Sequence, residues 1–381
     1  MGVFLFSYCE IYAAACLSTA RLTAVTTEPE RSHDEEGARV GNGAAGVLRG
    51  KRAWIISDGK AGHEIQMLGI AEALGVDAEI KPITAPGNLY KLTAPYGPPP
   101  VGARFGAPGS SFAPPWPAIA FATGRLTTPY IRALKRRAGM QTFTVILLDP
   151  KTGQRSADLF WVPEHDTRRG ANVVTTLTSA HRYAPERIAQ LRAKMPASIA
   201  ALPTPRVAVL IGGPNGDYRY GPDETARLAR ALEALARSGA GLMITASRRT
   251  PPDLLDAVDK ATETGQRFFW RGEGPNPYPD FLASADAFVV TADSVNMVGE
   301  AAATGRPIHV FHPAGGSSKF DRFHAALSEK GITRPLDDGR GLESWNYEPL
   351  DSAHIIAREI ERRYAARLKM IPGLCQDGGC E

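Results

Sequence analysis

Two glycine-bearing turns in this sequence carry residue types that handle anions and protons. The first reads Ser57-Asp-Gly-Lys-Ala-Gly-His63, and the second reads Ile211-Gly-Gly-Pro-Asn-Gly216. Glycine lets the backbone approach an anion closely, and the N–H groups and dipole of a following helix favour negative charge there. The turns are separated by about 150 residues, a domain-sized interval. The pattern predicts two nucleotide-handling α/β lobes that face one cleft.

His63 is the strongest acid/base candidate. It follows Gly62 at a predicted helix start, where the helix dipole disfavours the protonated imidazole and leaves a neutral base. The alternative is a histidine that only hydrogen-bonds loop backbone. Lys60 could contact a phosphate, or it could be a solvated loop lysine. Our hypothesis assigns the catalytic role to His63.

A second group of candidates follows the apolar run Ala287–Thr291. Ser294 is the predicted N-cap of a short helix that holds Met297 and Glu300. A carboxylate near a helix start can accept hydrogen bonds from both hydroxyls of a ribose, while the N-terminal amides receive phosphate. The alternative is that Ser294 only caps the helix and Glu300 is solvated.

Polar and glycine residues recur where the predicted strands end, which is where open parallel sheets bind ligands. The candidate substrate-binding residues of the first lobe are Asp58, Gly59, Lys60, Gly62, Arg125 and Asp149. Those of the second lobe are Gly212, Gly213, Asn215, Ser247, Arg248, Arg249, Thr291, Asp293, Ser294, Met297 and Glu300. Because adjacent side chains point apart, we expect at most one of the two arginines to contact a diphosphate directly.

Short β-rich runs alternate with helical stretches from Lys51 onward, which is typical of parallel sheets covered on both faces. The predicted strands are 52–57, 118–123, 143–148, 158–162, 206–211, 241–246, 267–270, 287–291 and 307–311. The predicted helices are 64–74, 128–137, 185–195, 222–237, 252–263, 279–284, 295–304 and 352–368. Residues 85–117 are rich in proline and glycine, so we expect a long irregular loop there.

The fold class expected is therefore α/β, with two Rossmann-type parallel-sheet lobes and a cleft between them. We expect a disordered extension over 1–50, a first lobe over 51–203 on the acceptor side, and a second lobe over 204–350. Residues 351–370 are predicted to form a helix that crosses back to the first lobe, and 371–381 a flexible tail.

Composition excludes several classes of protein. The 44 basic residues nearly balance the 40 acidic ones, which leaves a net charge of +4 and no nucleic-acid footprint. All four cysteines lie near the termini, at Cys9, Cys16, Cys375 and Cys380, so a disulfide framework in the folded body is excluded. This fits a reducing, cytoplasmic compartment. Histidine spacing predicts no metal site.

The run Arg132–Arg137 is rich in basic residues and includes Lys135-Arg-Arg137. Such a run is usually a solvated helix face. The alternative is peripheral contact with an anionic membrane surface.

Three motifs together resemble a known family. The segments Ser57–His63, Ser247–Thr250 and Thr291–Met297 are similar to the mitochondrial-fission (elongated-mitochondria) family, whose bacterial members are labelled predicted nucleoside-diphosphate-sugar epimerases. The resemblance covers about residues 52–368. The epimerase label fits poorly, because the Gly-x-x-Gly-x-x-Gly loop breaks at Ile65 and no Tyr-x-x-x-Lys pair occurs in the chain.

More distantly, the motifs resemble glycosyltransferases of the GT-B type, such as the peptidoglycan N-acetylglucosaminyltransferases (MurG). That resemblance implies a transferase with two Rossmann-like lobes. His63 would act on the acceptor, Gly212 and Gly213 would lie near the donor phosphates, and Glu300 would bind the ribose. A departure from the family pattern is Ala61, which replaces a glycine in the first loop.

The implied function is transfer of a sugar from a nucleotide-diphosphate sugar to an acceptor hydroxyl, without a cofactor. The acceptor is unidentified, and a lipid-linked molecule is one alternative. The competing hypothesis is a non-catalytic nucleotide-binding or scaffold protein that acts in membrane fission or envelope processes.

Overall fold

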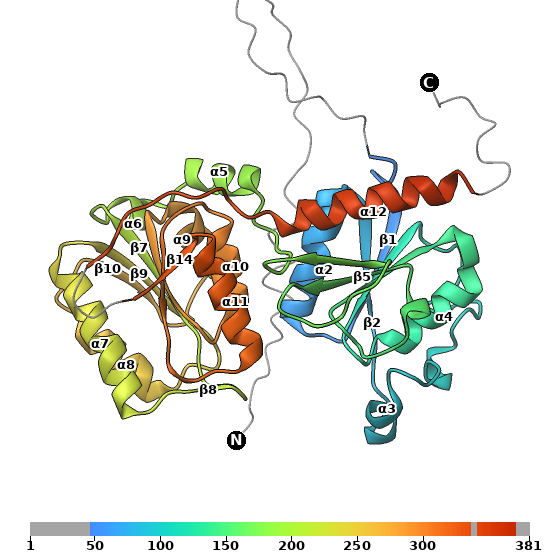
Figure 1. Cartoon of the computed structure of the whole chain (residues 1–381), viewed down its shortest axis with the longest axis horizontal. Coiled ribbons are helices and arrows are strands. Elements are labelled where there is room, and N and C mark those ends of the chain that lie inside the picture. Colours follow the sequence, from blue (N-terminus) through green and yellow to red (C-terminus); the bar gives the residue numbers. More distant parts are fainter. Residues whose placement is uncertain (1–45, 337–340, 371–381) are drawn as a thin grey trace, which may run out of the picture. The chain divides into compact units, whose positions relative to one another are not determined.

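Two six-stranded sheets form the centre of the protein. The computed structural model describes residues 46–336 and 341–370. The strand orders are β2-β1-β3-β4-β5-β6 and β10-β9-β7-β11-β12-β14 (Figure 1), and every pair of neighbours within each sheet is parallel. The predicted α/β fold class with two Rossmann-type parallel sheets is confirmed. One compact unit contains both sheets and takes in the described residues 46–271, 277–336 and 341–370.

The first sheet is built from β1 (Arg52–Ser57), β2 (Asp77–Pro82), β3 (Ile119–Thr123), β4 (Phe143–Leu147), β5 (Leu159–Pro163) and β6 (Val173–Thr176). Its associated helices are α2 (Ala61–Leu74), α3 (Asn88–Thr93), α4 (Thr128–Ala138) and α12 (Ser352–Leu368). Trp54 and Ile56 of β1 pack on the side of α4, whereas Ala53 and Ile55 pack on the side of α2 and α12. Helices therefore cover both faces of this sheet.

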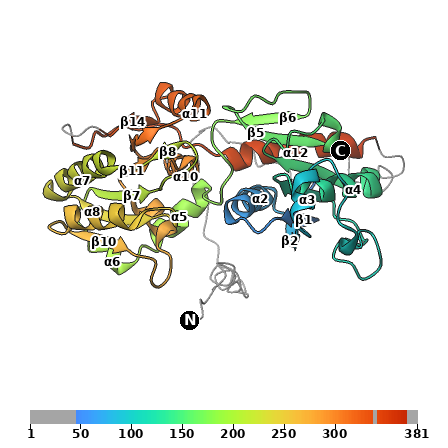
Figure 2. The ribbon, with the colours of Figure 1, turned by 90° about the horizontal axis from the view of Figure 1, so that it is seen from below.

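The second sheet is built from β7 (Arg206–Ile211), β9 (Gly241–Ala246), β10 (Arg267–Trp270), β11 (Ala287–Thr291), β12 (Ile308–Phe311) and β14 (Thr333–Pro335). Its helices are α5 (Pro185–Ala193), α6 (Ala197–Ala200), α7 (Pro222–Arg237), α8 (Pro252–Thr262), α9 (Tyr278–Ser284), α10 (Val295–Ala302) and α11 (Ser318–Glu329). Side chains of α7 and α8 pack on one face, and those of α9, α10 and α11 on the other. In Figure 2 the ribbons of α7 and α8 lie to the left of β7 and β11, and the ribbon of α10 lies to the right. A small antiparallel pair joins β8 (Tyr218–Arg219) and β13 (Ala314–Gly315).

The structure corrects several predicted elements. Helix α2 begins at Ala61 instead of Glu64, so Gly62 and His63 lie in its first turn. The loop predicted over 85–117 contains the short helix α3 and a 3-10 turn at Val101–Ala103. Strands β2, β6 and β14 and helix α11 were not predicted.

Other expectations fall on residues outside the described ranges. These are the disordered extension, apart from its last residues, the C-terminal tail and all four cysteines. Among the helices of residues 46–336 and 341–370, none is long and apolar enough to cross a bilayer.

Candidate functional site

His63 forms a hydrogen-bonded pair with Asp58 at the carboxyl end of β1. Its Nδ1 lies 3.1 Å from the Asp58 carboxylate, and the two side chains are 20% and 2% exposed. Burial alone would raise the pKa of Asp58, but His63 and Lys60 beside it hold the pKa below its usual value. The charged carboxylate orients the ring and leaves Nε2 as the nitrogen for other partners, an arrangement typical of an activated base.

The backbone around this pair explains why glycines are present. Gly59 has φ +78 and Gly124, in the turn after β3, has φ +83, both in the left-handed region. A Cβ on Gly124 would lie 3.3 Å from His63 Cε1. Gly124 therefore lets the imidazole lie directly against the backbone of a neighbouring strand end, and the ring position is fixed from two sides.

A small pocket lies beside this pair and is lined by residues associated with both sheets. Gly62 at the start of α2 faces Asn296 at the start of α10: a Cβ on Gly62 would lie 3.7 Å from Asn296 Nδ2. The pocket volume is about 30 Å³. Sites for drug-sized ligands are typically ~300–1,000 Å³, so in this state the pocket has room for water only. Its lining residues are Gly62, Ile65, Gln66, Ser179, Ala180, His181, Asn296 and Glu300.

We call this cavity the strand-end pocket. Two of its buried polar atoms have no hydrogen-bond partner among the described residues. They are Gln66 Oε1 and His181 Nε2. Burial lowers the pKa of His181 to about 4, so the ring is neutral at pH 7. The Tyr183 N–H lies 3.3 Å from His181 Nδ1, which places the proton on Nε2. The pocket thus offers one donor and one acceptor, and buried groups of this kind normally have a partner.

Glu300 adds a carboxyl group to the same pocket. Burial raises its pKa to about 7, and a hydrogen bond from the Tyr278 hydroxyl offsets part of that effect. The alternative that Glu300 is solvated is wrong, since its side chain is at most partly accessible and is hydrogen-bonded within the protein. A carboxyl group with such a pKa can hold or release a proton near neutral pH.

Glu300 should make the protein less stable as pH rises. Its pKa is raised in the folded state, so between about pH 4.5 and pH 7 the folded state keeps a proton that the unfolded state loses. The free energy of unfolding should fall by about 1–3 kcal/mol across this window because of Glu300. Glu300→Gln should remove that part of the slope, as measured by urea unfolding at a series of pH values.

The matched control is Glu263→Gln at the exposed end of α8, which should keep the wild-type slope. An unchanged slope in Glu300→Gln would show that the carboxyl group is not held protonated in the folded protein.

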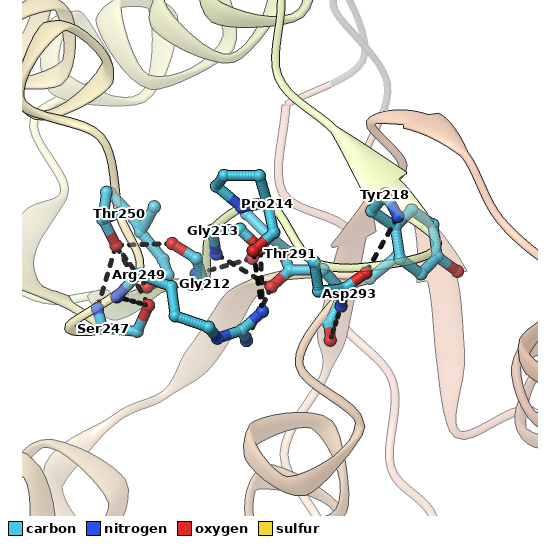
Figure 3. Close-up of polar contacts among 12 residues, drawn as sticks. Gly212, Gly213, Pro214, Tyr218, Ser247, Arg249, Thr250, Thr291 and Asp293 are labelled. Atoms are coloured by element: carbon cyan, nitrogen blue, oxygen red, sulfur yellow. Dashed lines mark hydrogen bonds and ion pairs between the residues drawn. The ribbon is translucent and has the colours of Figure 1, made fainter.

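The glycine turn after β7 encloses a buried carboxylate (Figure 3). Asp293, whose side chain is 0% exposed, accepts a hydrogen bond from the Gly213 N–H at 2.8 Å. It also accepts a hydrogen bond from the Tyr220 hydroxyl at 2.6 Å. Arg249 forms an ion pair with the same carboxylate at 3.1 Å. The Gly212 N–H donates to Thr291 Oγ1 at 2.7 Å. Burial, followed by the charge of Asp293, raises the pKa of Tyr220 above its usual range.

This cluster changes the predicted role of the second turn. Gly212 and Gly213 were expected to present free amides to donor phosphates, but those amides are already bonded to Thr291 and Asp293. A Cβ on Gly212 would overlap Asp293 Oδ2 at 2.1 Å. The glycines are therefore needed for close packing around an internal anion, which satisfies the same N–H groups that a phosphate would bind.

Several other predicted residues have partners within the protein. Ser247 and Thr250 hydrogen-bond each other in the turn that directs Arg249 toward Asp293. Arg125 donates to Ala94 O, and Asp149 pairs with Arg168. Asn215 accepts hydrogen bonds from the amides of Asp217 and Tyr218. Met297 packs against the core of the second sheet, Arg248 is exposed, and the exposed Lys60 pairs with Asp58.

Ser294 is the N-cap residue of α10, as predicted, but its side chain makes no capping hydrogen bond. Of the predicted residues, the structure thus brings Asp58, Gly62, His63 and Glu300 to the pair and its pocket. Asp293 and Arg249 gather at the second turn.

Sequence reasoning missed His181, Gln66 and Tyr220. The available signal for His181 was the polar segment Thr178-Ser-Ala-His181, which follows the β-branched run of β6. Glu64, which accepts a hydrogen bond from the Ser57 hydroxyl, was also missed. Over the part of the chain that the structure describes, no group of three or more His, Cys, Asp or Glu is placed to hold a metal ion.

Solved structures similar to this chain include a MurG and a UDP-GlcNAc 2-epimerase. MurG from Acinetobacter baumannii is 13% identical with a TM-score of 0.43, and covers 83% of this chain and 93% of its own. A UDP-GlcNAc 2-epimerase from Methanocaldococcus jannaschii is 10% identical with a TM-score of 0.46, and covers 82% and 99%. Likenesses this distant do not decide the function.

Sequence comparison gives a closer relationship. The chain is 31% identical over 276 residues to the mitochondrial fission protein ELM1 of Arabidopsis thaliana, a match that spans 66% of this chain and 65% of the plant protein. The chain therefore covers less than two thirds of that relative. The family model described as Mitochondrial fission ELM1 matches residues 61–364, which include the second glycine turn, the end of the first one from Ala61, and all the residues that line the strand-end pocket. The chain belongs to the Mitochondrial fission ELM1 family.

Proposed function

We propose that the protein transfers a sugar from a nucleotide-diphosphate sugar to an acceptor hydroxyl at the strand-end pocket. One observation supports this proposal: three features lie close together. They are the His63–Asp58 pair, the start of α2, and the start of α10, the helix that carries Glu300. In this proposal His63 Nε2 takes the proton from the acceptor hydroxyl, which attacks the anomeric carbon while the nucleotide diphosphate leaves.

The two helix starts support the binding of the diphosphate. The first N–H groups of a helix have no partner inside the helix, and the helix dipole favours an anion near them. Gly62 and Asn296 lie in the first turns of α2 and α10 and face one another. The leaving diphosphate would gain stabilisation from both helices. Since the Gly212 and Gly213 amides are already occupied, the start of α10 replaces them in this role.

The polar atoms of the pocket suit a ribose. A hydroxyl group both donates and accepts, and His181 Nε2–H and Gln66 Oε1 supply one donor and one acceptor. The Glu300 carboxyl group can accept from ribose hydroxyls when its proton is lost. The pocket must widen to admit the ligand, because about 30 Å³ holds no nucleoside.

A second function, a scaffold that keeps the fold without turnover, is favoured by one observation. The Asp293 carboxylate occupies the amides of the second glycine turn and neutralises Arg249, which removes one phosphate site. A scaffold of this kind would ignore nucleotide sugars.

The test is a thermal-shift panel of nucleotide diphosphates and nucleotide-diphosphate sugars. At a ligand concentration of 100 times Kd, binding should stabilise the folded protein by about 2.7 kcal/mol, seen as a higher melting temperature. His181→Phe, which removes the donor, and Glu300→Ala should each lose most of the shift. Glu263→Ala is the matched control and should keep it. No shift with any nucleotide sugar would favour the scaffold.

A further inference from the structure

One long segment of the first half carries positive charge and no negative charge. Between Glu79 and Asp149 the sequence contains eight lysines and arginines and no aspartate or glutamate. The same segment holds three of the most exposed large apolar side chains of the described chain: Leu89 and Leu92 at 75%, and Val101 at 96%. Large apolar side chains left exposed within one segment make that segment a candidate interaction surface.

The backbone that carries these side chains is firmly attached to the body of the protein. Tyr90 of α3 is buried, and its hydroxyl donates to Leu126 O at 2.8 Å. Arg132 of α4 donates to the carbonyls of Pro95 and Tyr96 at 2.7 and 2.8 Å. Figure 1 shows α3 lying apart from the strands of its sheet. The leucines are thus held outward by anchored neighbours and are not the loose tip of a mobile loop.

Basic side chains of the same segment are exposed as well. Lys91 lies between the two leucines in sequence and is exposed, as are Arg104, Arg136 and Arg137. Arg137 stacks over the Phe105 ring at 5.2 Å, which places the end of α4 next to the segment that follows Val101. The solvated-face interpretation therefore does not describe the whole run, since Arg132 holds the loop and Lys135 pairs with Asp158.

We propose that this surface, formed by Leu89, Leu92, Tyr96 and Val101 with Lys91, Arg104, Arg136 and Arg137, docks the protein on a bilayer rich in anionic lipid. We call it the α3 surface. Leucines that project from a short anchored helix can enter the headgroup region, and the surrounding cations are attracted to anionic headgroups. A nucleic acid would use the positive charge but would leave the leucines in water. The absence of any acidic residue in this segment favours an anionic bilayer over a protein with mixed charges.

The proposal is tested by co-sedimentation of the full chain with lipid vesicles. Vesicles of phosphatidylcholine and phosphatidylserine should bind the protein, vesicles of phosphatidylcholine alone should bind it more weakly, and added salt should reduce the difference. Leu89→Ser with Leu92→Ser should lower the partition coefficient about tenfold or more on the mixed vesicles. Arg136→Glu should lower it about tenfold on mixed vesicles and little on neutral ones.

Matched controls come from exposed residues elsewhere. Ile355→Ser on α12 and Arg230→Glu on α7 should bind as the wild type does. All variants should keep the wild-type melting temperature, because the side chains are exposed. Equal binding by the double leucine variant, or no preference of the wild type for mixed vesicles, would overturn the proposal. So would self-association that the leucine substitutions abolish without any vesicle binding, which would make the surface a contact between copies.

Discussion

Replacing Asp293 with alanine should lower the free energy of unfolding by about 3–5 kcal/mol. The carboxylate is fully buried and receives hydrogen bonds from the Gly213 amide and the Tyr220 hydroxyl as well as the Arg249 ion pair. Its removal leaves two buried donors without an acceptor and a cation without its partner, and each unsatisfied group costs free energy. The measurement is urea unfolding followed by tryptophan fluorescence.

Two comparisons separate this cause from a simple loss of packing. Asp256→Ala, on the exposed side of α8, is the matched control and should change stability by less than about 0.5 kcal/mol. Added formate should restore part of the stability of Asp293→Ala and none of that of Asp256→Ala, because a small anion can refill the cluster. If formate has no effect, or if the alanine variant is as stable as the wild type, the carboxylate is not what holds the second turn together.

Five strands and a well-marked helix were predictable from the sequence to the residue. Strands β1, β7, β9, β10 and β11 have the predicted bounds, since each is a short apolar or aromatic run. Helix α7 also has its predicted bounds, because Pro222 and the two acidic residues after it mark a helix start.

The strands that were missed are all at the edges of sheets. β2 and β6 flank the first sheet, and β14 flanks the second. An edge strand is paired on one side only and lies partly in water, so its sequence needs no continuous apolar run: β2 reads Asp-Ala-Glu-Ile-Lys-Pro. Because β6 was not predicted, the segment that follows it was not recognised either. That segment places His181 in the pocket.

The candidate site shows a different limit of sequence reasoning. Residue types at the strand ends pointed to His63 and Glu300, and the structure places Glu300 in the pocket and His63 next to its lining residue Gly62. Whether the glycine amides were open could not be read from the chain, since Asp293 is 80 residues from Gly213 and only the folded sheet brings them together. Two turns with the same local signature therefore differ in state: the first borders a pocket, and the second is filled by the protein's own carboxylate.

This difference places the expected chemistry on the first turn. There the Asp58 carboxylate contacts the imidazole of His63, and the backbone at Gly124 lies close against the ring. In the proposed mechanism His63 is the base, and a side chain oriented in this way loses little conformational freedom when the acceptor binds. The second half of the chain contributes to the same place through α10, with Asn296 beside Gly62 and Glu300 deeper in the pocket.

His63→Ala should reduce turnover by about 100- to 10,000-fold while the binding of the nucleotide sugar is retained. The reason is that His63 is the proposed base for the acceptor hydroxyl, and the one histidine that lines the pocket, His181, has a pKa that burial lowers to about 4. The measurement is the initial rate of nucleotide diphosphate release from the donor found in the panel, together with the thermal shift that the donor produces.

Two further variants, Asp58→Asn and Lys60→Ala, test how the neighbours of His63 affect turnover. The amide of Asp58→Asn keeps the shape but loses the charge that orients Nδ1–H, so turnover should fall by an intermediate factor. Lys60 is 66% exposed and contacts Asp58 from the solvent side, so Lys60→Ala should change the rate only about two- to threefold.

Full turnover by His63→Ala would exclude the mechanism while leaving nucleotide-sugar binding intact. Loss of both turnover and the thermal shift, with a normal melting temperature, would instead assign His63 to binding.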